Sequence, residues 1–134
     1  MAKFDNISVI KLAIVKILQW KVEFYQLANG SSPPLDWFFE QDTKVQAKFA
    51  RIFKLLQEHG ISLGMPHVRP IKNSKLFEIR VEQKTNIYRI FYFAYTGRRF
   101  ILLHGFQKKT QKTPAKEIEI AESRRAEFLA QENN

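Results

Sequence analysis

The segment from Leu76 to Lys116 constrains the fold most strongly, because it contains three consecutive runs with strand character. In Phe77 to Gln83 apolar and polar residues alternate, which is typical of a strand with one buried face. Asn86 to Tyr95 is rich in β-branched and aromatic residues, and Phe100 to Phe106 is followed closely by the pair Lys108-Lys109. We therefore expect a small sheet that carries arginines and ends in a lysine pair.

The flanking segments predict one more strand and three helices. Trp20 to Ala28 alternates like a strand, and Ser32-Pro33 is a typical start of a short helix. A second helix, capped by Asp42 and ended by Gly60, has one apolar stripe, formed by Val45, Phe49, Ile52, Phe53 and Leu56. Thr113-Pro114 opens a final helix, whereas residues 64–70 are expected to be irregular. The pattern predicts an α+β domain over residues 20–134 with the order β-α-α-β-β-β-α.

Residues 1–19 form a separate, strongly apolar N-terminal extension. Lys11 and Lys16 interrupt its apolar run, no stretch approaches ~18 apolar residues, and no small-residue cleavage site follows. We expect a helix that packs on the domain rather than a signal peptide or a membrane span. The alternatives are a poorly ordered extension or a start codon assigned too far upstream.

Positive charge dominates the chain and is concentrated in the predicted sheet. The net charge is +9, and residues 65–116 alone contain twelve Lys or Arg against two Glu. Such a distribution favours a polyanionic partner such as nucleic acid, although a solvated basic surface gives the same count. The chain has no Cys, which excludes disulfides and thiolate chemistry and suits a cytoplasmic protein.

The residue types in the sequence favour a function that depends on a cationic surface. The three His residues are far apart, no ligand spacing suggests a metal site, and no glycine-rich phosphate loop or cofactor motif is present. Arg80 and Arg89 suit a phosphodiester clamp, and one of the crowded lysines Lys108 and Lys109 can act as a proton carrier. His104 is the nearby residue whose unperturbed pKa suits general acid–base catalysis near neutral pH.

Aromatic strand residues offer stacking surfaces for bases, with Tyr92 as the candidate together with Tyr88 and Phe106. Such a set of groups can cleave RNA without a metal, through attack of the ribose 2′-hydroxyl on the adjacent phosphate. For each of these residues the sequence leaves open a surface salt bridge or a core contact instead.

Three short runs together resemble the phage-derived HigB-like branch of the RelE/ParE toxin superfamily. They are FEIR at Phe77 to Arg80, YRIFY at Tyr88 to Tyr92, and HGFQKKTQKTP at His104 to Pro114. The resemblance implies an antiparallel sheet backed by N-terminal helices, with a C-terminal helix. It also implies the toxin of a type II toxin–antitoxin pair, which cuts mRNA on the ribosome without a metal and is neutralised by a protein antitoxin.

The resemblance also assigns roles to individual residues. Arg80 would hold the scissile phosphate, Lys108 and Lys109 would stabilise the transition state, and Lys72 and Lys75 match lysines that precede the arginine strand. Lys112 belongs to the same basic stretch, and together these lysines would bind RNA. RelE toxins carry a tyrosine a few residues past the basic pair, but this chain has Thr113-Pro114-Ala115 there, so His104 or a lysine would have to act as general base.

Two other functions fit the same features. A ParE-like inhibitor of DNA gyrase would share the fold without nuclease chemistry, and the lysine-rich stretch argues against it. A non-catalytic nucleic-acid-binding module would use the basic surface alone. No membrane partner and no small-molecule cofactor are expected.

Overall fold

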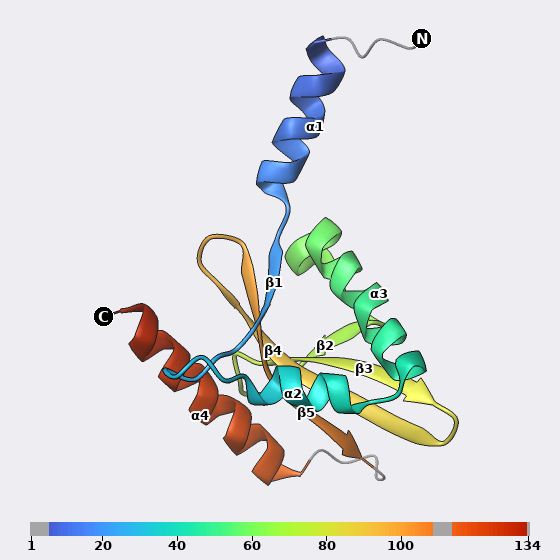
Figure 1. Ribbon diagram of the computed structural model, residues 1–134, viewed down its shortest axis with the longest axis vertical. Helices are drawn as coiled ribbons and strands as arrows, with labels where there is room; N and C mark the ends of the chain where they lie inside the picture. Colours follow the sequence, from blue (N-terminus) through green and yellow to red (C-terminus); the bar gives the residue numbers. More distant parts are fainter. Residues whose placement is uncertain (1–5, 109–113, 134) are drawn as a thin grey trace.

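The computed structural model describes residues 6–108 and 114–133. Four α-helices, one short 3₁₀ helix and five strands follow one another along these residues (Figure 1). They are α1 (Asn6–Leu18), β1 (Lys21–Phe24), α2 (Pro33–Glu40), α3 (Thr43–His59), η1 (Gly60–Ser62), β2 (Val68–Pro70), β3 (Phe77–Gln83), β4 (Asn86–Tyr95), β5 (Arg99–Lys108) and α4 (Ala115–Glu132).

The five strands form one sheet in the order β1-β5-β4-β3-β2. Neighbours pair antiparallel except β1, which runs parallel to β5 and is shorter than the expected strand at Trp20 to Ala28. The α+β class and the mostly antiparallel sheet confirm the sequence prediction. The prediction that residues 64–70 lack regular structure was wrong at Val68–Pro70, which pairs with β3 as an edge strand. Pro70 lacks a backbone donor, as is common in an edge strand.

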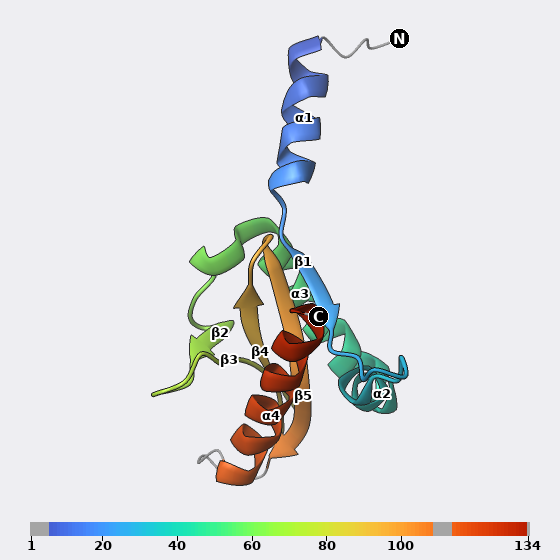
Figure 2. The same cartoon turned by 90° about the vertical axis from the view of Figure 1, so that its left-hand side faces the viewer.

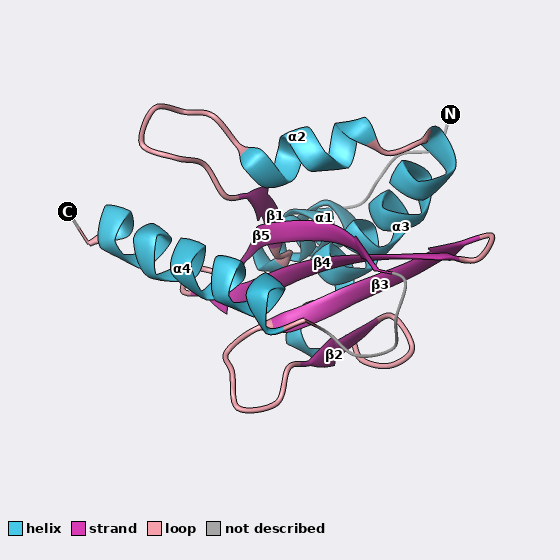
Figure 3. Ribbon diagram, turned by 90° about the horizontal axis from the view of Figure 1, so that it is seen from below, coloured by secondary structure: helices cyan, strands magenta, loops and turns pink. Residues whose placement is uncertain are grey.

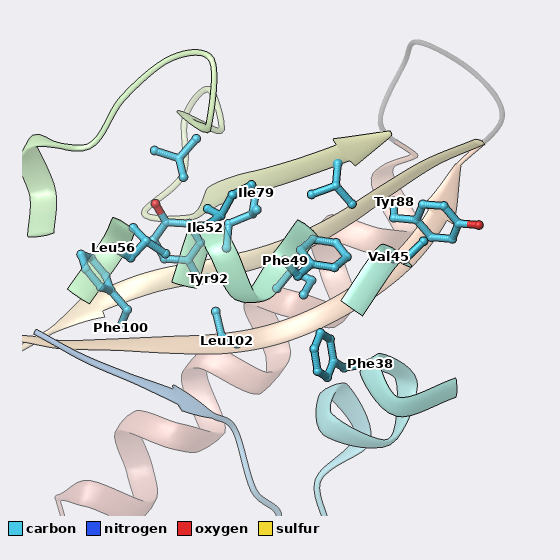
Figure 4. Packing of buried hydrophobic residues seen from close by; sticks show 13 residues of the cluster. Phe38, Val45, Phe49, Ile52, Leu56, Ile79, Tyr88, Tyr92, Phe100 and Leu102 are labelled. Carbon is cyan, nitrogen blue, oxygen red and sulfur yellow. The ribbon is translucent and has the colours of Figure 1, made fainter. Parts of the chain in front are cut away.

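One side of the sheet, here called the α3 face, packs against α2 and α3. Ser32 caps α2 and Asp42 caps α3 through a bond to the backbone N–H of Val45, so both predicted helix starts are confirmed. The apolar stripe of α3 lies on strand residues such as Ile79, Tyr92 and Leu102 (Figure 4). This face holds the larger core.

The opposite side, here called the α4 face, is covered by α4 over part of its length. Ala121 and Phe128 of that helix pack on Phe91, Phe93 and other strand residues. Figure 3 shows α4 over one end of the strands, with the β3–β4 hairpin extending away from the helix. The hairpin end of the α4 face therefore lacks a covering helix, and polar strand residues gather there.

A β-bulge in β5 decides which side chains reach the α4 face. Tyr92 pairs with Leu102, but the preceding Phe91 pairs with His104, so Leu103 is the extra residue. Leu102 packs on the α3 face, and Leu103 packs on the α4 face. Strand alternation then continues from His104, which places His104, Phe106 and Lys108 on the α4 face.

Helix α1 does not pack on the domain, contrary to the prediction from sequence. It projects away from the sheet, and none of its residues is buried (Figures 1 and 2). Its apolar residues lie around the whole helix, so no single stripe is available to face a core. No helix among the described residues is long and apolar enough to cross a membrane.

Close packing of α2 against β5 gives a direct test of the fold. A Cβ atom added to Gly105 would lie 2.2 Å from Cε3 of Trp37, whereas one added to Gly64 would meet nothing within 4 Å. We expect Gly105→Ala to lower the free energy of unfolding by about 1–3 kcal/mol in urea denaturation, because the indole must move. The matched control Gly64→Ala should change it by less than about 0.5 kcal/mol. Equal effects of the two variants would contradict the α2–β5 contact.

Candidate phosphate-binding site

A buried carboxylate joins the three strands at the hairpin side of the sheet. Glu78 of β3 is 1% exposed, and its two oxygens accept hydrogen bonds from different arginines. Arg69 Nε of β2 donates to Oε1 at 3.1 Å, and Arg89 Nη1 of β4 donates to Oε2 at 3.0 Å. Loss of one partner from such a buried pair typically costs about 3–5 kcal/mol, so this triad is a fixed part of the structure.

Arg80 lies next to this triad and remains accessible. The register pairs Arg80 of β3 with Arg89 of β4, and alternation places both on the α4 face with Glu78. Arg80 Nη2 donates to Glu82 Oε1 at 2.7 Å, in a pair whose carboxylate side chain is 63% exposed. Exposed ion pairs of this kind contribute about 1 kcal/mol or less, so an anionic ligand can replace Glu82.

Lys108 brings a further positive charge to the same face from β5. It is 4% exposed, and its Nζ has no hydrogen-bond partner among residues 6–108 and 114–133. Burial lowers the pKa of its ammonium, and repulsion from Arg89 lowers it further, with Glu78 acting in the opposite direction. We call Arg69, Glu78, Arg80, Arg89 and Lys108 the cationic cluster; it contains four basic groups and one carboxylate. An excess of positive charge in a site from which water is partly excluded favours the binding of an anion.

A cavity opens beside the cluster toward β2. Its volume is about 300 Å³, and it is lined by Met65, Pro66, His67, Val68, Arg69, Glu78, Arg80 and Glu82. Among the residues that the structure describes, no group of three acidic, His or Cys side chains is placed to hold a metal ion. Of the cationic cluster, Arg69, Glu78 and Arg80 line this cavity, together with His67 and Glu82.

His104 is not placed to serve this cluster as a general base. Its Nε2 is hydrogen-bonded to Glu117, and its Nδ1 lies 3.2 Å from Arg124 Nη1, so both ring nitrogens are engaged by α4. Burial is the main cause that lowers its pKa, opposed by Glu117. Arginine can only donate, so Nδ1 accepts and Nε2 carries the hydrogen in the neutral ring. In this structure His104 links β5 to α4.

Two residues predicted to contact RNA are buried in this structure. Arg89 is 1% exposed and acts as the inner partner of Glu78. Tyr92 is 2% exposed and stacks on Phe77, with ring centroids 5.6 Å apart, within the core of the α3 face (Figure 4). Both side chains belong to β4, the central strand, whose neighbours cover them on each side.

The remaining predicted lysines fall into two groups. Lys72 and Lys75 are exposed on the β2–β3 loop, where Ser74 hydrogen-bonds to Glu122 of α4 at 2.5 Å. They lie beyond the Phe77 end of β3, separate from Arg80 in mid-strand. Lys109 and Lys112 lie outside the described residues.

Sequence reasoning missed Arg69 as a site residue, because it falls in a segment that was expected to be irregular. Only the strand register identifies Arg69 as a site residue, because the pairing of β2 with β3 places Arg69 directly opposite Glu78.

The fold and the site describe a small α+β protein with a RelE-like sheet and a cationic surface. The family described as "Phage derived protein Gp49-like (DUF891)" matches residues 36–126, which include the whole cationic cluster. The chain therefore belongs to the Gp49-like family, a phage-derived family associated with RelE/HigB-like toxins. No curated protein matches the chain closely enough to count as a relative.

The burial of Lys108 predicts a gain in stability when its charge is removed. We expect Lys108→Met to raise the free energy of unfolding by about 1–3 kcal/mol near neutral pH, because a buried ammonium without a hydrogen-bond partner is replaced by an apolar chain of similar length. The control Lys54→Met, at an exposed site on α3, should have an effect below about 0.5 kcal/mol.

The pH dependence of this gain has a definite sign. The folded-state pKa of Lys108 lies below its ordinary value of 10.5, so the unfolded chain binds more protons between these two values. The advantage of Lys108→Met should therefore be complete below the folded pKa and vanish as the pH rises through it toward 10.5. A loss of stability in the variant at neutral pH would contradict this assignment.

Proposed function

We propose that the protein is a HigB-like toxin of a type II toxin–antitoxin pair and cleaves mRNA on the ribosome. The observation that carries this proposal is the convergence of Arg80 and Lys108, from separate strands, on one face of the sheet beside an open cavity. Membership of a phage-derived, toxin-associated family supports it. The ribosome as the site of action makes the cytoplasm the expected location.

The cluster suits cleavage of a phosphodiester through its own 2′-hydroxyl. In that reaction a P–O2′ bond forms and the P–O5′ bond breaks, which leaves a 2′,3′-cyclic phosphate and a 5′-hydroxyl. Negative charge grows on the phosphate oxygens in the transition state. Arg80 can hold these oxygens with its planar fork, and the buried guanidinium of Arg89 stabilises them electrostatically in a site of low dielectric.

The 2′-hydroxyl must lose a proton and the leaving 5′-oxygen must gain one. Within the cluster neutral Lys108 fits this role best, because it can accept the first proton and then donate it as an ammonium. Burial and neighbouring arginines lower its pKa, so its neutral form is more accessible than that of an exposed lysine. His104 is already engaged with Glu117 and Arg124. Lysine thus takes the place of the tyrosine that RelE toxins carry after the basic pair.

The same positive surface suits a protein antitoxin. An acidic segment of the antitoxin would lie over Arg80 and the cavity beside Arg69, and so exclude RNA. Co-expression with the neighbouring small reading frame should restore growth to cells that produce the protein. Failure of every neighbouring frame to do so would count against a toxin–antitoxin pair.

Loss of the accessible arginine should remove cleavage without loss of the fold. We expect Arg80→Ala to reduce the frequency of new mRNA 5′ ends about 100-fold or more, because one fixed donor to the developing charge is lost. The readout is transcript-end mapping on ribosome-bound mRNA after brief induction. Lys54→Ala, which removes an exposed positive charge from α3 on the other face, is the matched control and should cut like the wild type.

Growth arrest with intact mRNA would reject the nuclease assignment. A supercoiling assay with purified gyrase would then show whether the protein acts as a ParE-like inhibitor. Salt-sensitive RNA binding without any cleavage on translating ribosomes would instead indicate a binding module.

A further inference from the structure

The cavity between β2 and the cationic cluster has a composition that the proposed cleavage chemistry does not use. Arg69 and Arg80 are its arginines, while Met65, Pro66 and His67 form a neighbouring part of the wall that contains no arginine, lysine or carboxylate. Met65 is 70% exposed and lines this cavity, so its side chain is accessible to a ligand. A phosphate site beside an apolar wall fits a nucleotide better than a simple anion.

Arg69 is already oriented for a second anion contact. Its Nε–H is held by Glu78 at 3.1 Å, and within the described residues this is its only hydrogen bond, so the two terminal nitrogens remain available. Its side chain is 41% exposed. Because the buried carboxylate fixes the guanidinium before a ligand arrives, little side-chain entropy is lost on binding.

The sheet register sets the spacing of the two arginines. Arg69 is opposite Glu78, and Arg80 follows two residues later on the same face of β3. Diagonal positions of this kind are about 7–8 Å apart between Cα atoms, so two long side chains can meet on one phosphate. The Nε of Arg80 is buried and has no hydrogen-bond partner among the described residues.

We propose that this cavity binds one nucleotide of single-stranded RNA next to the cleavage point, with its phosphate between Arg69 and Arg80. The base or ribose lies against Met65, Pro66 and His67. This inference rests on the proposed function and extends it. The bound RNA would cross the strands from Lys108 on β5 to Arg69 on β2. An acidic peptide is the competing ligand, but it would leave the apolar wall unused.

The test measures binding by the full-length protein away from the ribosome. The probe is a fluorescein-labelled RNA hexanucleotide with 2′-O-methyl riboses, which cannot be cleaved, at fixed salt. We expect Arg69→Ala to raise the dissociation constant about tenfold, because a charge-assisted contact is lost. Lys54→Ala, with the same change of charge at an exposed site on α3, should raise it less than about threefold. Equal effects of the two variants would overturn the proposal.

Competition distinguishes a nucleotide from other anions. Uridine 5′-monophosphate should displace the probe at a lower concentration than inorganic phosphate, and Met65→Ser should reduce that difference without harm to the fold, because Met65 is exposed. Displacement by inorganic phosphate as readily as by the nucleotide, or more readily by a poly-glutamate peptide, would overturn the proposal. Melting curves of both Arg69→Ala and Arg69→Lys control for folding, since Arg69→Lys keeps the charge beside Glu78 and loses only the planar fork.

The outcome is separate from that of the nuclease test. Normal mRNA cleavage by Arg69→Ala, with unchanged probe binding, would remove the nucleotide subsite and leave the proposed function intact. Arg69-dependent nucleotide binding by a protein that leaves ribosomal mRNA uncut would remove the nuclease assignment and keep the binding site.

Discussion

The buried ion pairs of Glu78 set the arrangement on which the site depends. A carboxylate with 1% exposure is stable only because Arg69 and Arg89 neutralise it from the strands on either side. The triad still carries one net positive charge, and Arg80 and Lys108 add two more in the same place. The positive groups of the cluster repel one another, and the ammonium of Lys108 is buried, so the cluster lowers the stability of the fold. Such a cost is common at functional sites.

The sequence predicted the α4-face residues of β3 well, because strict alternation in FEIRVEQ leaves little choice of face. It also predicted both helix caps and the apolar stripe of α3. The convergence of Arg80 with Lys108 could not be derived in this way. It depends on the bulge at Leu103, since without the extra residue Lys108 would point to the α3 face. The run FILLHGF is continuously apolar near that point and has no alternation in which a shift could be seen.

The errors share a physical cause, which is that residue type does not reveal position within a sheet. Arg89 and Tyr92 have the chemistry of RNA contacts, but their strand is central and both side chains are covered. His104 has suitable chemistry but is engaged by α4, more than ten residues away in the sequence. Arg69 belongs to the site only because β2 pairs with β3, which the sequence pattern did not indicate. The packing predicted for α1 failed because its apolar residues surround the helix instead of forming one face.

A structure of the full-length protein with a 2′-O-methyl RNA would test the central claim most directly. The measured quantity is the position of the bound phosphate relative to the cationic cluster. We expect phosphate oxygens within hydrogen-bond distance of the Arg80 guanidinium, on the α4 face, with the cavity beside Arg69 occupied. A phosphate bound instead by Lys72 and Lys75 on the β2–β3 loop, or on the α3 face, with Arg80 still paired to Glu82, would contradict it.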